Sequence, residues 1–471
     1  MRNTACVAEN KNNEDKMSNN PELFAKSSPL FRSSNETDYD VVIVGAGVAG
    51  CSAAYHLLAQ KLGEESSASG LRVLIVDAGP QAGEGLAPRT RSGTATMGVA
   101  PCVKMMVQLF AGSCDDFVRH HGREGARRYL DATREGLVLQ KDIAGRLWVA
   151  EKDFKKNVKE LGSYYVGSTE RDEIELQREF EILSSLMDND DGIEWCDGDR
   201  LSSVEGMSED FRCGIYFPKD AVIDSSLYAK VLIEYVLKKS KGNAEFWPNT
   251  TVQSIDRQTS GEAVSLKVSD GRCQTINAKK VVVATGAIRL FHEQHGCLNG
   301  LIKPCYSYLV HVPTAVPPGV GAHSENYCSP NFFTWGYTHD WCYTNGKIRI
   351  SGEDHFSAYK SPKEEERCNR LSRWTLERYR CNDLYTDEEV SSFPRQHGLY
   401  SETVDMVPIV GSLLTEGNIC YLLGCNAWGQ TILSYCASLV PGLLGFQGLT
   451  ESQRDILNLV SVRRFSHLPS N

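Results

Sequence analysis

The feature that most constrains this fold is a glycine-rich turn that follows a run of branched apolar residues. Residues 41–50 read Val-Val-Ile-Val-Gly-Ala-Gly-Val-Ala-Gly, and a helix-like apolar run follows them. Strand, glycine turn and helix occur in the order that a dinucleotide-binding βαβ unit requires. Gly45 permits the tight turn, Gly47 lets a pyrophosphate approach the backbone, and Gly50 lets the helix pack on the strand. The N-terminus of the helix then offers unpaired N–H groups to the phosphates.

A second apolar strand, Leu71–Asp77, supplies the other half of this unit. The Asp77 carboxylate at its end can accept hydrogen bonds from a ribose 2′-hydroxyl, and it disfavours the 2′-phosphate of NADP. Asp77 lies 27 residues beyond Gly50 (77 − 50), and the polar insert at 63–70 accounts for the long interval. The alternative interpretation is an ordinary βαβ turn in which the glycines coincide by chance.

Composition excludes several classes of partner. The chain has 471 residues and a net charge of −10, which argues against nucleic acid or an anionic membrane surface as a partner. No uninterrupted apolar stretch reaches the length of a transmembrane segment. The 16 cysteines are scattered without metal-ligand spacing, so we expect free thiols, a cytoplasmic location and no metal site. Residues 1–37 are polar and predict a disordered leader, and organellar targeting by this leader stays open.

Further elements follow downstream. Gly145–Ala150 predicts a strand, and Asp224 predicts the N-cap of a helix that ends near Lys239. An Asn345–Gly346 turn between two alternating runs predicts a β-hairpin. Apolar strands are expected at 280–286, 406–411 and 419–424, and a last helix begins within Gly424–Thr431.

Six segments in this order resemble the FAD-dependent amine and amino-acid oxidoreductases of the D-amino acid oxidase, glycine oxidase and sarcosine oxidase type. The resemblance runs from about residue 38 to 445. It is carried by Gly45–Gly50, the Ser92–Gly98 loop, Val222–Asp224, Ala284–Gly286, the hairpin Asn345–Asp354, and Asp405–Gly411 followed by Gly424–Gly429.

The resemblance implies an α/β fold. It consists of a Rossmann-like, doubly wound FAD-binding domain interleaved with an antiparallel-sheet α+β substrate domain. The FAD-binding domain would comprise residues 38–100, 216–300 and 396–445, and the substrate domain 101–215 and 301–395. The leader (1–37) and a C-terminal tail (446–471) flank them.

The resemblance also implies the residues that hold the cofactor. The Gly424–Thr431 segment would aim a helix at the flavin N1–C2=O edge and stabilise reduced anionic flavin; the alternative is a simple glycine-rich helix cap. We expect FAD to be bound non-covalently, because the position of the attachment cysteine in some sarcosine-oxidase-like members is Gly398 here. The expected cofactor-binding residues are Gly45, Ala46, Gly47, Val48, Ala49, Gly50, Asp77, Ala78, Ser92, Thr96, Met97, Val252, Thr285, Gly286, Gly424, Asn426, Gly429, Gln430 and Thr431.

Departures from the resemblance bear on the substrate. Relatives carry arginines at two positions that resemble carboxylate-binding sites, and this chain has Tyr343 and Tyr400 there. A substrate carboxylate would lose its bidentate partners. The tyrosines could form an aromatic wall for an amine or serve only in packing. Arg349 or Arg395 would compensate only if its side chain points inward. The candidate catalytic side chains are Tyr343, Tyr400, His355 and Tyr308.

The resemblance implies that an enzyme of this kind transfers a hydride from a small-molecule CH–NH donor to flavin N5. The electron acceptor, O2 or another, stays open. One alternative is oxidation of a CH–OH bond in a 2-hydroxy acid or polyol phosphate. Another is a flavin-binding protein without catalysis, which the missing arginines suggest.

Overall fold

The computed structural model describes residues 38–62, 70–83, 105–106, 112–148, 158–187, 192–257, 264–269, 273–286, 298, 300–313, 328–336, 338–344, 346–413 and 417–465. All of them belong to the compact unit Thr37–Asn471. The predicted leader (1–37) and the Ser92–Gly98 loop, with Ser92, Thr96 and Met97, lie outside the described residues.

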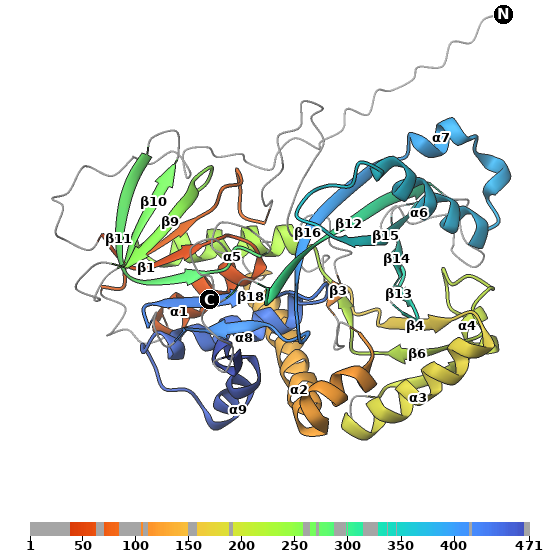
Figure 1. Cartoon of the computed structure of the whole chain (residues 1–471), viewed down its shortest axis with the longest axis horizontal. Coiled ribbons are helices and arrows are strands. Elements are labelled where there is room, and N and C mark those ends of the chain that lie inside the picture. Colours follow the sequence, from red (N-terminus) through yellow and green to blue (C-terminus); the bar gives the residue numbers. More distant parts are fainter. Residues whose placement is uncertain are drawn as a thin grey trace, which may run out of the picture. The chain divides into compact units, whose positions relative to one another are not determined.

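The first sheet is built around the predicted βαβ unit. Its central strand β1 (Tyr39–Val44) pairs in parallel with β2 (Val73–Val76) and β11 (Cys273–Val283). Every residue of β2 is buried, as expected for a parallel strand covered on both faces. The outer strands are β8 (Ala244–Trp247), β9 (Thr251–Arg257), β10 (Val264–Ser269), β17 (Ile409–Gly411) and β18 (Ile419–Leu423). Among the described residues the order β17-β18-β11-β1-β2-β8 runs across the sheet, and β10 and β9 extend from β11 (Figure 1).

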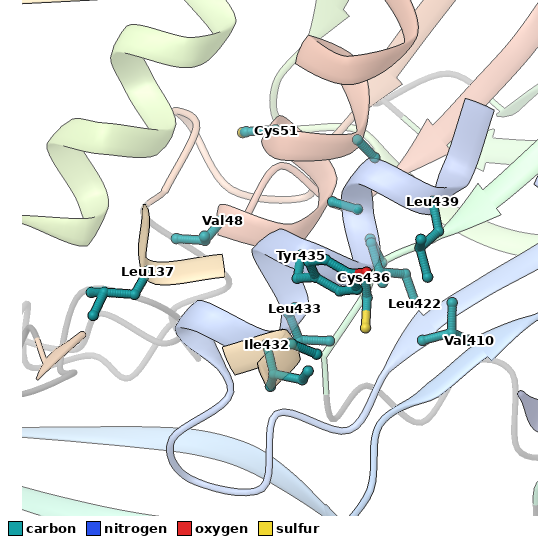
Figure 2. Packing of buried hydrophobic residues seen from close by; sticks show 14 of the residues in the cluster. Val48, Cys51, Leu137, Val410, Leu422, Ile432, Leu433, Tyr435, Cys436 and Leu439 are labelled. Atoms are coloured by element: carbon teal, nitrogen blue, oxygen red, sulfur yellow. The ribbon is translucent and has the colours of Figure 1, made fainter. Parts of the chain in front are cut away.

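Helices α1 (Val48–Leu62), α5 (Ser225–Lys239) and α8 (Gln430–Leu443) pack together beside this sheet. Asp224 caps α5 as predicted, because its side chain accepts a hydrogen bond from Leu227 N (3.0 Å). Figure 2 shows how Ile432 and Cys436 of α8 lie among apolar side chains from the neighbouring elements. The predicted α/β, doubly wound layer is therefore confirmed. α9 (Glu451–Val460) and the 3₁₀ turn η7 (Val462–Phe465) follow it.

The predicted strand at Gly145–Ala150 is wrong. Helix α2 runs from Cys114 to Trp148, with a kink at Gly122 (φ 72°, ψ 167°). Ile143, Ala144 and Leu147 are buried, and this spacing of three and four residues defines one face of a helix. The short apolar run therefore has the period of a helix and not that of a strand.

The second sheet is antiparallel, as predicted, except where β13 pairs in parallel with β4. Across the described residues its strands follow the order β16 (Arg395–Thr403), β12 (Ile302–Pro313), β15 (Lys347–Phe356), β14 (His339–Thr344), β13 (Asn331–Thr334), β4 (Ser163–Gly167), β6 (Cys213–Phe217) and β5 (Glu194–Asp197). The hairpin β14–β15 is confirmed, with Gly346 at φ 73° in its turn. Two short strands, β3 (Met105–Met106) and β7 (Ala221–Val222), pair separately.

Helix α6 (Glu364–Arg378) covers one face of β12 and β15 (Figure 1). We call this the α6 face; Tyr306, Ile350 and Trp341 pack there with Leu371. We call the opposite one the inner face, and it carries the row Phe333, Asp340, Ser351 and Leu309, which lie opposite one another across four strands. The remaining helices are α3 (Glu170–Leu186), α4 (Gly198–Ser202), η6 (Asn382–Leu384) and α7 (Asp387–Ser391).

A buried carboxyl group joins α3 to the start of α2 and gives a testable stability effect. Glu179 Oε1 accepts a hydrogen bond from Cys114 N (2.7 Å), and burial raises the pKa of Glu179 to about 7. Folding therefore favours the protonated group, so its contribution is largest below pH 4.5 and is lost as the pH rises through 7. We expect Glu179→Gln to gain about 3 kcal/mol over the wild type between pH 4.5 and 8. Urea unfolding across this range tests it; parallel pH curves for the two proteins would contradict it.

Candidate active site

The glycine turn after β1 brings two strand ends and a helix into direct contact. Gly45 has φ 105°, and a Cβ atom there would lie 2.4 Å from Ala284 O at the end of β11. A Cβ atom on Gly50 would lie 1.9 Å from Gly45 O. Ala284 N donates to Val44 O (2.8 Å), which fixes the strand ends side by side. Only glycine fits at Gly45 and Gly50, and the first-turn N–H groups of α1, at Val48 and Ala49, have no partner within the helix.

Asp77 lies directly beside this turn and holds its backbone. Its Oδ2 atom accepts a hydrogen bond from Ala46 N (2.6 Å), and its Oδ1 atom accepts one from Gly79 N (2.7 Å). Burial raises the pKa of Asp77, while these two hydrogen bonds lower it. Each carboxylate oxygen keeps a further lone pair for a hydroxyl donor. The sequence predicted a ribose-binding role for Asp77 but not its bond to the glycine turn.

The loop before α8 is attached to the end of β16. Thr403 N donates to Asn426 Oδ1 (2.7 Å), and Asn426 N donates to Ser401 O (2.9 Å). Asn426 and Ala427 have φ 49° and φ 61°, so two successive non-glycine residues adopt the left-handed region. A Cβ atom on Gly429 would lie 2.3 Å from Cys425 O. The Oδ1 atom of Asn426, an expected cofactor ligand, therefore serves to hold this loop on β16.

The first residue of α8, Gln430, presents an unused donor. Ser225 Oγ donates to Gln430 Oε1, and Gln140 Nε2 donates to its main-chain carbonyl (3.4 Å). The Nε2 atom of Gln430 is buried and has no hydrogen-bond partner among the described residues. Thr431, which follows it, is fully buried.

The other expected cofactor residues are placed as follows. Thr285 and Gly286 follow β11, and Gly286 has φ 66°; no non-neighbouring atom of the described residues lies within 4 Å of its Cβ position. Val252 lies on β9, where its side chain packs in an apolar cluster with Val44 and Val283. Gly47 and Ala78 lie in the loops that follow β1 and β2, and Gly424 follows β18 with φ 82°.

Of the four predicted catalytic side chains, Tyr400 alone lies on the inner face. It is opposite Cys305, and its hydroxyl group donates to Asp354 Oδ2 (2.7 Å) and contacts Glu402 Oε1 (3.1 Å). Ser307 also donates a hydrogen bond to Asp354. The inner face is directed towards the loop before α8, because Phe333 packs on Trp428 with ring centroids 5.0 Å apart.

Tyr343, Tyr308 and His355 lie on the α6 face, so the structure does not bring these three predicted side chains together with Tyr400. Tyr343 is buried in the apolar cluster of this face. Tyr308 OH accepts a hydrogen bond from Ser361 N (2.9 Å), and the His355 ring stacks on the Tyr308 ring (5.9 Å, 9°). These three side chains lie on the face opposite Tyr400 because successive side chains of a strand point to opposite faces of the sheet.

The two arginines considered as substitutes separate in the same way. Arg349 is buried on the inner face, opposite Cys342 and His311. Arg395 lies opposite Val310 on the α6 face and donates to Ser391 O. Arg349 is therefore the arginine that points inward.

Carboxyl groups that the sequence did not identify dominate the inner face around Tyr400. Desolvation by the surrounding protein raises the pKa of Asp354, although the residue keeps contact with solvent, and hydrogen bonds from Ser307 and Tyr400 lower it. Burial also raises the pKa values of Glu402 and Tyr400, and it raises that of Asp340 to about 7. Asp354 is exposed and Tyr400 is half-buried, so an external ligand can reach them. Cations on this face include Arg349 and Lys303, and Lys303 is opposite Glu402.

The described part of the chain offers neither a metal site nor a membrane-spanning helix. No group of histidine, cysteine, aspartate and glutamate residues there has the arrangement of a metal site. No helix there combines the length and the apolar character needed to cross a membrane.

Comparisons with known proteins complete the description. The sequence model of the family described as FAD dependent oxidoreductase matches residues 40–440. Glycine oxidase from Geobacillus kaustophilus superposes with a TM-score of 0.63 at 17% identity, over 88% of this chain and 96% of that one. Iminodiacetate oxidase from Chelativorans sp. BNC1 gives 0.60 at 16% identity, over 89% and 98%. FAD-bound L-α-glycerophosphate oxidase from Mycoplasma pneumoniae gives 0.59 at 14% identity, over 88% and 96%. No curated protein sequence matches this chain.

Proposed function

We propose, from the premise that this chain belongs to the family of FAD-dependent oxidoreductases, that it oxidises the CH–NH bond of a small, cationic amine. The observation that carries this proposal is the Tyr400 hydroxyl group, which lies between Asp354 and Glu402 on the inner face. A protonated amine that binds there would meet two carboxylates and an aromatic ring.

The described residues fit FAD as the cofactor. The Gly45–Gly50 turn and the open first turn of α1 provide a cradle for its pyrophosphate, and Asp77 adjoins this turn with oxygens suited to ribose hydroxyl groups. Gln430 Nε2 offers a buried donor at the start of α8. When bound, FAD supplies the two-electron acceptor for the hydride. We propose that it is held without a covalent bond.

The carboxylates beside Tyr400 lie near the loop before α8, which is an expected cofactor-binding segment. The end of β16 is bonded to the loop before α8 through Thr403, Asn426 and Ser401. Tyr400 immediately precedes this bonded stretch. A substrate amine at Tyr400 would therefore lie close to the helix that the family resemblance aims at the flavin.

Charge favours an amine over a carboxylate at this position. Relatives are described as oxidases of glycine, iminodiacetate and α-glycerophosphate, so their descriptions include both CH–NH and CH–OH donors. An anionic group beside Tyr400 would approach Asp354 and Glu402, and like charges in a partly desolvated site repel. Lys303 and Arg349 lie on the same face and offset only part of this charge.

Reduction of the bound flavin without oxygen tests this proposal. The purified protein would first be precipitated with acid; flavin absorbance in the supernatant supports non-covalent FAD, and absorbance that stays in the pellet contradicts it. The intact protein would then be mixed anaerobically with benzylamine, putrescine, sarcosine, glycine, lactate and glycerol 3-phosphate. We expect the amines without a carboxylate to bleach the flavin fastest. Bleaching only by lactate or glycerol 3-phosphate, or by none of the compounds, would contradict the proposal.

A further inference from the structure

We propose that Asp354 is a catalytic residue that accepts the proton of the substrate's ammonium group. This inference rests on the proposed amine oxidation and names the residue that prepares the amine for it. Resemblance pointed to Tyr400 and His355, and neither the motif nor the spacing singled out Asp354.

The placement of Asp354 depends on an irregularity in β15. Tyr308 pairs with Gly352, but Tyr306 pairs with His355, so β15 contains an extra residue in this interval. Glu353 in this bulge adopts φ 57° and turns to the α6 face, where it pairs with Arg370 (2.6 Å). Asp354 is therefore directed to the inner face, towards Tyr400 and Ser307.

The surroundings of Asp354 suit a proton acceptor. Its hydrogen bonds come from two neutral hydroxyl groups, those of Tyr400 and Ser307. Glu402, in contrast, faces Lys303 across the β12–β16 pair. Because Asp354 is exposed, it can pass an accepted proton on to solvent.

The proposed step is a single proton transfer. One N–H bond of the ammonium group breaks and an O–H bond forms on Asp354, so a cation and an anion become two neutral groups. The electron pair of the broken N–H bond stays on nitrogen, where it is available to form a C=N bond when the hydride leaves carbon. Tyr400 orients the carboxylate for this transfer.

Charged groups, other titratable groups and a hydroxyl group surround the Asp354 carboxylate and influence its pKa. Glu402 and Tyr400 face it from β16, Cys305, Ser307 and Lys303 from β12, and Asp340 from β14. His355 adjoins it on β15, and Arg367 lies on α6. Desolvation by the surrounding protein raises the pKa of the exposed Asp354 carboxyl group towards neutral pH, and hydrogen bonds from Ser307 and Tyr400 oppose this shift.

The pH dependence of anaerobic flavin reduction by benzylamine and putrescine tests this role. The wild type should show a plateau of kcat/KM between the pKa of Asp354 and that of the amine. In Asp354→Asn, kcat/KM should be about 100-fold lower than in the wild type at pH 7. It should then rise tenfold per pH unit, because only amine that is already neutral in solution reacts. Asp354→Glu should keep the plateau, and Glu402→Gln should raise KM while keeping the plateau.

A second readout does not depend on turnover. Tetramethylammonium carries a positive charge but no N–H bond, and calorimetry of its binding to the FAD-loaded protein reports the charge of Asp354. Binding should weaken at low pH in the wild type, and Asp354→Asn should keep only the part of this pH dependence that arises from Glu402. An unchanged plateau in Asp354→Asn would overturn the inference while leaving amine oxidation intact. Failure of both amines to reduce the wild type would overturn both.

Discussion

Replacement of Gly50 by alanine is expected to abolish FAD binding and to lower stability. The new Cβ atom would lie 1.9 Å from Gly45 O, and both contacting groups belong to the backbone, so no flexible side chain can relieve the clash. Helix α1 must then move away from β1, which removes its N-terminus from the pyrophosphate position. Overpacking of this kind costs about 1–3 kcal/mol, and we expect FAD affinity to fall at least about 100-fold. Titration of the FAD-free protein with FAD, followed by flavin fluorescence, measures the loss.

Gly145→Ala is the matched control for this experiment. Gly145 lies in α2, and in the part of the chain that the structure describes no side chain or other element comes within 4 Å of its Cβ position. Alanine there should raise stability by about 0.5–1 kcal/mol because it is the better helix former. Equal FAD affinity for Gly50→Ala and Gly145→Ala would contradict the role assigned to the glycine turn.

Replacement of Tyr400 by arginine is expected to eliminate amine oxidation. The guanidinium group would reach Asp354 and Glu402, neutralise them and repel a cationic substrate. Like-charge contacts in an interface cost several kcal/mol, so kcat/KM for benzylamine should fall about 1,000-fold, whereas FAD affinity should change little. Anaerobic stopped-flow reduction together with FAD titration separates these two effects.

Tyr343 supplies the comparison, because the sequence predicted the same role for both tyrosines. Its side chain packs on the α6 face, so Tyr343→Phe should leave kcat/KM for benzylamine within about threefold. A large loss of kcat/KM in Tyr343→Phe together with a small loss in Tyr400→Arg would show that the substrate binds on the α6 face and not on the inner face.

The fold was predictable because its main signals are local. The glycine turn, the Asp224 cap and the Asn345–Gly346 hairpin each depend on a few adjacent residues with strong backbone preferences. The end of α2 was missed because a six-residue apolar run cannot distinguish a strand from a helix by periodicity. The burial of Ile143, Ala144 and Leu147 identifies the segment as a helix. Burial depends on contacts with distant elements, which the local sequence does not show.

The candidate site was less predictable because it depends on strand faces. Strict alternation along β15 from Arg349 and Ser351 would place His355 on the inner face. The bulge at Glu353 reverses the order, so that Asp354 is directed inward and His355 packs on Tyr308. Gly352 (φ 146°) directly precedes Glu353 (φ 57°), and a glycine within a strand, which often marks a bulge, was the available sequence signal. The pairing of Asp354 with Tyr400 joins residues 46 positions apart.

The position of a bound amine distinguishes the inner face from the α6 face as the substrate site. A crystal structure of the FAD-loaded protein would be determined without oxygen in the presence of the amine that reduces it fastest. We expect the amine nitrogen within about 4 Å of an Asp354 or Glu402 carboxylate oxygen, beside the Tyr400 ring. An amine bound on the α6 face, or one whose nitrogen points away from both carboxylates, would contradict it.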